Sequence, residues 1–285
     1  MKNRPSLTAL GIALMRAIES SRPEDERLVY DPYARHFISP ILWLAGRFFV
    51  RSGYSERRGP GVTGFLAARE RIIDDTLRQA LAEGACQVVL LGAGYDTRPY
   101  RMPELKSVPV FEVDHPATQE HKRRRLQAIL PAIPPNVTFV PIDFNQQSLA
   151  GSVLPAGCSR KEKTVFIWQG VIYYLDPDAV DSTLQFITNH FPAGSRLVFD
   201  YALQSHLDSP QGEVRSTNRY GRFTGERLRY AIPDGGLEAF LQARGFRLLV
   251  DYRAADLHRM YFTGKRSRRT ISPGYAVAVA GVAHR

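Results

Sequence analysis

Cysteine is scarce in this sequence: Cys86 and Cys158 are the only two cysteines among 285 residues. The first precedes a predicted core strand, and the second lies in a predicted loop. Two cysteines so placed exclude a disulfide scaffold and a cysteine metal cluster. We therefore predict no metal site. Such cysteine usage is typical of a reducing compartment, and we expect a cytoplasmic protein.

Long uninterrupted hydrophobic runs are also missing. Residues 7–18 resemble the core of a secretory signal, but Arg16 interrupts them and no small-residue cleavage site follows cleanly. The apolar segment 41–50 contains Arg47 and is too short to span a bilayer. The sequence therefore predicts no membrane partner.

Acidic residues are fewer than basic ones: 28 Asp and Glu stand against 38 Lys and Arg, a formal net charge of +10. Such an excess raises the affinity of a surface for nucleic-acid phosphates. However, the two dense basic runs, 122–125 and 265–269, are not interleaved with aromatic residues that could stack on bases. We predict no nucleic-acid partner and a small-molecule substrate. A nucleic-acid-binding module is the non-enzyme alternative.

A Gly-x-Gly turn directly follows an apolar strand pattern. Residues 88–91 are Val-Val-Leu-Leu, and Gly92, Ala93 and Gly94 come next. Glycine can take backbone angles forbidden to other residues and has no Cβ where a ligand must approach. The pattern is typical of a site for a nucleoside-bearing cofactor. The alternative is a glycine-rich turn that only ends a core strand.

The third glycine of the dinucleotide-binding fingerprint is missing, because Thr97 stands at that position. In dinucleotide sites this glycine lets the following helix pack closely under the pyrophosphate. A cofactor without phosphates, such as S-adenosyl-L-methionine, does not need it. The sequence therefore favours a methyltransferase, with an NAD-dependent oxidoreductase as the alternative enzyme class.

Acidic residues lie at the ends of the next two predicted strands. Glu112 and Asp114 come 20 and 22 residues after Gly92, a spacing at which a carboxylate can accept hydrogen bonds from both ribose hydroxyls. After the third strand come Asp143, a candidate acceptor for the adenine amino group, and Phe144, a candidate aromatic wall. An acid after a strand is also common as a turn or cap residue.

The chain is predicted to be one α/β domain. Residues 1–84 form a mainly helical N-terminal lid segment. Residues 85–285 alternate strands and helices, which implies a mostly parallel sheet with helices on both faces and a lid insertion near 203–230. Seven strands, the last antiparallel, fit a Rossmann-like class I methyltransferase. They are predicted at 87–91, 108–113, 137–141, 164–169, 196–201, 246–252 and 275–282, and the main helices at 6–20, 41–50, 64–83, 117–130, 177–189 and 236–244.

The helix predicted at 64–83 carries Arg69 beside its apolar face. A guanidinium matches a carboxylate with two parallel hydrogen bonds, so Arg69 is a candidate to hold the carboxylate of the cofactor's amino-acid part. Arg71 and Asp75 are spaced as an i,i+4 pair on the same helix. A salt-bridged surface helix explains that pair equally well.

Seven blocks spread over nearly the whole chain carry a family resemblance: 30–34 (Tyr-Asp-Pro-Tyr-Ala), 68–75, 92–98 (Gly-Ala-Gly-Tyr-Asp-Thr-Arg), 111–116, 143–144, 169–175 (Gln-Gly-Val-Ile-Tyr-Tyr-Leu) and 199–201. With them the chain resembles the leucine carboxyl methyltransferase family, in its branch of small-molecule S-adenosylmethionine-dependent O-methyltransferases. The resemblance implies that Arg69 binds the cofactor carboxylate and that Gly92 lies under the methionine. It also implies that Asp114 binds the ribose, and Asp143 with Phe144 the adenine.

Two positions depart from the usual pattern of that family. The family usually has Thr after the arginine, where this chain has Glu70, and Glu before the glycine, where this chain has Gln169. Loss of that glutamate removes a negative charge near the cofactor's ammonium group. We therefore expect Gln169 to bind the cofactor by a hydrogen bond rather than an ion pair.

The methyl acceptor is predicted from the shortage of bases. A carboxylate acceptor is already ionised at neutral pH, whereas a phenol or hydroxyl needs a general base. Of the histidines only His115 stands at a predicted core strand end, where a helix start is the favoured role. His206 follows the fifth predicted strand and is the better candidate if a base is used. We predict carboxylate O-methylation with no assigned catalytic base. A phenol, a hydroxyl or a protein C-terminus is the alternative acceptor. Substrate-pocket candidates are Tyr173, Tyr174, Tyr201 and His206, although ordinary packing explains the tyrosines equally well.

Overall fold

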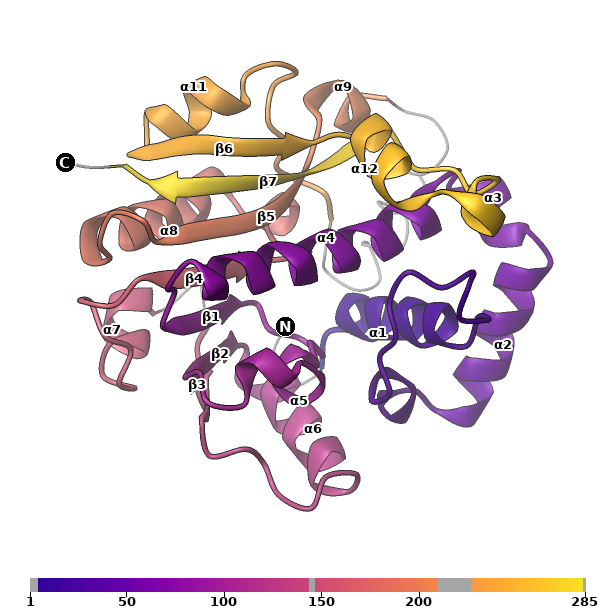
Figure 1. Ribbon diagram of the computed structural model, residues 1–285, viewed down its shortest axis with the longest axis horizontal. Coiled ribbons are helices and arrows are strands. Elements are labelled where there is room, and N and C mark those ends of the chain that lie inside the picture. The colour runs from indigo at the N-terminus through magenta and orange to yellow at the C-terminus, as the bar shows by residue number, and fades with distance from the viewer. Residues whose placement is uncertain (1–4, 144–146, 210–226, 284–285) are drawn as a thin grey trace.

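The computed structural model describes residues 5–143, 147–209 and 227–283. Its centre is a seven-stranded sheet in the order β3-β2-β1-β4-β5-β7-β6 (Figure 1). Strands β1 to β5 are parallel, and β7 is antiparallel to both of its neighbours. The predicted α/β fold and its antiparallel last strand are confirmed. The strands are β1 (Gln87–Leu91), β2 (Val110–Asp114), β3 (Val137–Pro141), β4 (Thr164–Trp168), β5 (Arg196–Ala202), β6 (Phe246–Tyr252) and β7 (Tyr275–Val282).

The central strands form because their residues are apolar without alternation. Every residue of β1 and β4 is buried, as expected for parallel strands that are covered on both faces. The predicted bounds of β1, β3, β6 and β7 match those observed. The other three strands differ from their predicted bounds by at most two residues at an end.

The longest helix, α4 (Val62–Ala82), crosses the face of the sheet turned toward the viewer in Figure 1 and contacts β4 and β5. Its inward side carries the buried apolar residues Phe65, Ile72 and Leu77 and the buried charged residues Arg69, Glu70 and Asp74. No helix in the described part of the chain has the length and apolar character needed to cross a membrane. The other helices are α1 (Leu7–Ser20), α2 (Pro40–Arg51), α3 (Tyr54–Arg58), α5 (Arg98–Arg101), α6 (Pro116–Gln127), α7 (Leu149–Val153), α8 (Pro177–His190), α9 (Gln204–Leu207), α11 (Leu237–Gln242) and α12 (Ala254–Tyr261), with 3-10 turns η1 (Ala34–Phe37), η2 (Pro103–Leu105), η3 (Ile172–Tyr174) and η4 (Gly264–Arg266).

Polar contacts anchor α1 at both ends. The Ser6 side chain caps the helix by accepting from the Ala9 N–H at 3.0 Å, and the Ser6 N–H donates to the Thr118 hydroxyl of α6 at 3.2 Å. Near the other end, Glu19 accepts from Arg269 at 2.8 Å. These contacts hold α1 beside the strand ends. The division into a lid and a core stays a prediction, and residues 210–226 of the predicted insertion lie outside the described residues.

Candidate functional site

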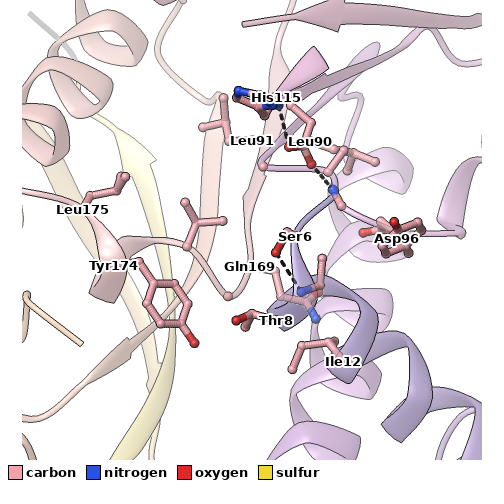
Figure 2. A pocket seen from close by; sticks show the side chains of 18 of the residues that line it. Ser6, Thr8, Ile12, Leu90, Leu91, Asp96, His115, Gln169, Tyr174 and Leu175 are labelled. Atoms are coloured by element: carbon pink, nitrogen blue, oxygen red, sulfur yellow. Dashed lines mark hydrogen bonds between the residues drawn. The ribbon is translucent and has the colours of Figure 1, made fainter. Parts of the chain in front are cut away.

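A cavity of about 340 Å³ lies at the carboxyl ends of β1, β2 and β4, where the strand order reverses between β1 and β4. Ligands bind at this point of open α/β sheets because the loops after the two strands diverge there. Figure 2 shows Tyr174 and Leu175 on one side of the cavity, and Ser6, Thr8 and Ile12 at the start of α1 on the other.

The turn after β1 lines the cavity with Gly92, Ala93 and Gly94. Gly92 has φ of 69° and Gly94 has φ of 48°, in the left-handed region that favours glycine. A Cβ on Gly92 would lie only 2.5 Å from Cγ2 of Val171, which also lines the cavity. The sequence therefore needs glycine at position 92 both for its backbone angle and for lack of space.

Asp114 ends β2 and also lines the cavity. Its carboxylate accepts hydrogen bonds from the backbone N–H groups of Gly94 and His115, the second at 2.6 Å. Burial raises the pKa of this carboxyl, and the two backbone hydrogen bonds oppose that rise. The strand end thus presents an acceptor that the backbone holds in place.

The structure does not bring Glu112 to the cavity, which corrects the expectation for this residue. Its side chain is fully buried and accepts from the Lys122 ammonium at 2.6 Å and from the Tyr100 hydroxyl at 2.8 Å. An acid two residues before the strand end lies inside the layer between sheet and helix, where it needs partners of its own. Of the two acids, only Asp114 faces a ligand space.

Asp143 follows β3 and lines the same cavity. Its predicted neighbour in the adenine site, Phe144, lies outside the described residues. His115 also lines the cavity, and its Nδ1 accepts from the Ala117 N–H at 3.3 Å at the start of α6. The predicted helix-start role of His115 is therefore confirmed.

Arg69 lines the cavity from α4 with a fully buried side chain. Its Nη1 lies 2.5 Å from Asp200 Oδ2 and 3.2 Å from the Tyr173 hydroxyl. Its Nε and Nη2, which form the other edge of the guanidinium, are buried and have no hydrogen-bond partner among the described residues. Buried donors are almost always paired in proteins, so this edge is available to a ligand.

A network of buried charges lies next to the cavity. Three guanidiniums and four carboxylates form it, and each of these side chains is at most 11% exposed. Arg98 lies at its centre, 2.7 Å from Glu70 and 2.7 Å from Asp74. Asp96 also pairs with Arg98 and lines the cavity. We call this set the arginine network: Arg16, Arg98, Arg101, Asp31, Glu70, Asp74 and Asp96.

Gln169 connects the arginine network to the cavity. It follows β4 and lines the cavity, as Figure 2 shows. Its Oε1 accepts from Arg98 Nη1 at 2.9 Å, and its Nε2 donates to Glu70 Oε1 at 2.6 Å. The two residues that depart from the family pattern, Glu70 and Gln169, are therefore in direct contact.

Of the four substrate-pocket candidates, only Tyr174 lines the cavity. The Tyr173 hydroxyl is directed to Asp200, 2.9 Å away, and so supports Arg69 instead of a substrate. Tyr201 is in the core, where its hydroxyl donates to Asp251 at 2.9 Å. His206 packs on the Tyr275 ring with centroids 4.9 Å apart, and burial lowers its pKa. The structure therefore does not bring Tyr173, Tyr201 or His206 to this cavity. Tyr201 and His206 lie at and after the end of β5, which β4 separates from β1.

The sequence predicts a helical N-terminal lid at residues 1–84, but it does not identify which residues of the first helix line the cavity. The serine before α1 is a recognisable helix start, but nothing in the local pattern says that this helix end faces the strand ends. Arg229, whose guanidinium lies 3.1 Å from Asp176, was also missed. The missed lining residues include Ser6, Thr8, Ala9, Ile12, Arg16, Asp96, Val171, Asp176 and Arg229.

Solved structures resemble this chain in fold. A DUF574 family protein from Streptomyces avermitilis has a TM-score of 0.62 at 16% identity, with 95% of this chain and 96% of that chain covered. A protein of Thermobifida fusca, assigned as a methyltransferase, has a TM-score of 0.60 at 16% identity, with 99% and 97% covered. At such identity these two likenesses establish the fold alone.

Sequence comparisons go further. YktD of Bacillus subtilis, named as an S-adenosyl-L-methionine-dependent methyltransferase, is 32% identical over 202 residues, which are 70% of this chain and 66% of YktD. A Mycobacterium sp. (strain KMS) protein named in the same way is 30% identical over 272 residues, with 84% of this chain and 83% of that protein covered. The family model described as leucine carboxyl methyltransferase matches residues 9–188. The chain therefore belongs to the leucine carboxyl methyltransferase family.

Proposed function

We propose that the cavity binds S-adenosyl-L-methionine and that the protein is an O-methyltransferase acting on a carboxylate of a small molecule. The observation that supports the cofactor best is the convergence on one cavity of Arg69, the turn at Gly92 and the Asp114 carboxylate. The relatives named for S-adenosyl-L-methionine-dependent methyl transfer support the same cofactor.

The unpaired edge of Arg69 suits the carboxylate of the cofactor's amino-acid part. Nε and Nη2 point along one edge of a planar guanidinium, so one carboxylate satisfies both donors at once. Asp200 and Tyr173 hold the opposite side of Arg69 through Nη1. They thereby fix the guanidinium for a ligand on its free edge.

The other two groups suit the methionine part and the ribose of the cofactor. The Gly92 turn leaves backbone uncovered where a side chain would fill the space. The Asp114 carboxylate accepts one backbone N–H on each oxygen, and each oxygen retains a lone pair for a ribose hydroxyl. These residues are neutral or anionic, as a cofactor without phosphates requires.

The choice of a carboxylate acceptor depends on the lack of a free histidine base among the described residues that line the cavity. When bound, the cofactor supplies a methyl group on a positively charged sulfur, and a carboxylate oxygen can accept that methyl without losing a proton. His115 is the histidine among the described lining residues, and its Nδ1 already accepts a backbone N–H. In the neutral ring the other nitrogen then carries the proton, so it cannot act as a base. Arg229 also lines the cavity, but its guanidinium is paired with Asp176 at 3.1 Å, so the pair adds no net charge there.

Two measurements test the proposal. Calorimetry with S-adenosylhomocysteine, NAD⁺ and a short RNA should give one site for the first and none for the others. S-adenosyl-L-methionine labelled in its methyl group, offered with a panel of carboxylic acids and phenols, should label an acid. Mild alkali should then release the label as methanol, because it cleaves methyl esters and not aryl methyl ethers.

A base-stable product would contradict the carboxylate acceptor and leave methyl transfer standing. Binding of NAD⁺ or RNA in place of S-adenosylhomocysteine would overturn the whole proposal.

A further inference from the structure

Glu70 and Gln169 are 99 positions apart in the sequence and 2.6 Å apart in the structure, between Glu70 Oε1 and Gln169 Nε2. In the family pattern given above, the carboxylate belongs to the strand-end position, and the helix position carries a threonine. Here the strand end carries an amide and the helix carries the carboxylate. The negative charge is therefore still present, on the residue that contacts the strand-end side chain instead of on that side chain itself.

Glu70 also fixes which way the Gln169 amide points. A carboxylate only accepts hydrogen bonds and a guanidinium only donates them, so Nε2 must face Glu70 and Oε1 must face Arg98. The reverse orientation would place an NH₂ group against a guanidinium and an oxygen against a carboxylate. Without Glu70, Arg98 would be the one remaining partner of the amide among the described residues.

The charge of Glu70 gives the arginine network its negative excess. Three guanidiniums face four carboxylates, and Glu70 is the carboxylate that all three guanidiniums approach. Its distances are 2.7 Å to Arg98, 3.5 Å to Arg16 and 3.9 Å to Arg101. Burial by itself raises the pKa of Glu70, but the arginines, Arg98 first, hold it far below its usual range. Glu70 is therefore ionised at neutral pH.

We propose that Glu70 is a positioning residue for the α-ammonium group of the cofactor. It acts through Gln169, whose amide it orients, and it supplies the negative charge that favours a cation at this wall of the cavity. The proposal rests on the proposed function, since it needs a ligand that carries an ammonium group. It makes Glu70 and Gln169 one functional unit, in which the carboxylate can occupy either position.

Two ligands separate this role from a structural one. S-adenosylhomocysteine carries the ammonium group, whereas 5′-methylthioadenosine has the same nucleoside and a thioether but no amino-acid part. Glu70→Thr should weaken binding of S-adenosylhomocysteine by about tenfold or more, the worth of a charge-assisted hydrogen bond, and leave 5′-methylthioadenosine unchanged. Asp75→Thr is the matched control, because it removes a carboxylate from the same helix outside the arginine network. It should change neither affinity.

The double variant provides the sharper test. Gln169→Glu alone places two carboxylates in contact and should lower the melting temperature of the ligand-free protein. The same change in the Glu70→Thr background restores a single carboxylate and should recover most of the affinity for S-adenosylhomocysteine. Gln169→Glu should therefore lower stability when residue 70 is Glu, and restore affinity for S-adenosylhomocysteine when residue 70 is Thr.

Equal affinity of Glu70→Thr and the wild type for S-adenosylhomocysteine would overturn the inference. So would a parallel loss for both ligands, or a double variant no better than Glu70→Thr. If Glu70→Thr does not fold, Glu70→Gln keeps the shape without the charge and should show the same ligand difference; wild-type affinity in that variant would also overturn the inference. A wild-type protein that binds neither ligand would instead contradict the proposed function itself.

Discussion

At the scale of single residues, Asp114 gives the most direct test of the nucleoside site. Asp114→Ala should weaken binding of S-adenosylhomocysteine by about ten- to a hundredfold, or roughly 1.5–3 kcal/mol, because a carboxylate forms charge-assisted hydrogen bonds to hydroxyls. Calorimetry on the purified variant measures the change.

The control for Asp114 lies on the same strand. Glu112→Gln removes a buried carboxylate that faces Lys122 and Tyr100 instead of the cavity. It should lower the melting temperature and leave the affinity for S-adenosylhomocysteine as it is. If Glu112→Gln weakens binding and Asp114→Ala does not, the ribose assignment belongs to Glu112.

Single site residues could be predicted where the strand end itself defines them, and not elsewhere. Gly92 and Asp114 were found because the end of a strand is visible in the sequence. Glu112 shares a face of β2 with Asp114, and only the roughly 6–7 Å between them along the strand decides which one reaches a ligand. Tyr201 was predicted at the pocket and lies elsewhere for a different reason. β4 separates β5 from β1, so the end of β5 lies away from the cavity between β1 and β4.

At the scale of elements, the junction between β1 and its turn depends on Gly92. Gly92→Ala should lower the free energy of unfolding by more than the roughly 1–2 kcal/mol that a left-handed angle costs a residue with a Cβ. The excess comes from Val171, whose Cγ2 would lie 2.5 Å from the new Cβ. Chemical denaturation measures the loss.

Two further variants isolate that contact. Gly84 has φ of 92° and open space around its Cβ position, so Gly84→Ala carries only the cost of the backbone angle. Adding Val171→Ala to Gly92→Ala should return part of the lost stability. Equal losses for Gly84→Ala and Gly92→Ala would contradict the crowding.

Elements were predicted well where the hydrophobic period is strong. The strands and the long helices fall close to their predicted places. Burial of a strand on both faces produces a continuous apolar run, and burial of a helix on one face produces a helical spacing of apolar residues. The helix α12 was missed, since Arg253 stands at its N-cap in place of the Ser, Thr, Asp or Asn that usually marks a start; the Arg253 N–H donates to the Asp256 side chain. The side of the sheet that α1 covers follows from tertiary packing, which local sequence does not encode.

At the scale of the whole molecule, stability should fall as the pH drops below about 6.5, the pKa of an unperturbed histidine in the unfolded chain. Burial lowers the pKa of His206, and burial with Arg125 and Arg124 lowers that of His121. Between 6.5 and the lower folded values, the unfolded chain binds protons that the folded protein does not. Each histidine contributes a slope of at most about 1.4 kcal/mol per pH unit.

Urea denaturation between pH 8 and pH 5 measures this dependence. His206→Gln should flatten the fall below pH 6.5, whatever its effect on stability at pH 8. An unchanged slope in His206→Gln would show that this imidazole does not contribute.

The place of β7 between β5 and β6 determines when the sheet can be completed during synthesis. β6 precedes β7 in the chain, but its backbone pairs with β7 alone among the described strands. A nascent chain that has emerged only as far as residue 274 therefore has β5 as an open edge and β6 without a neighbour. Open strand edges are templates for aggregation. β6 and β7 can therefore join the sheet only together, once residues 275–282 have left the exit tunnel.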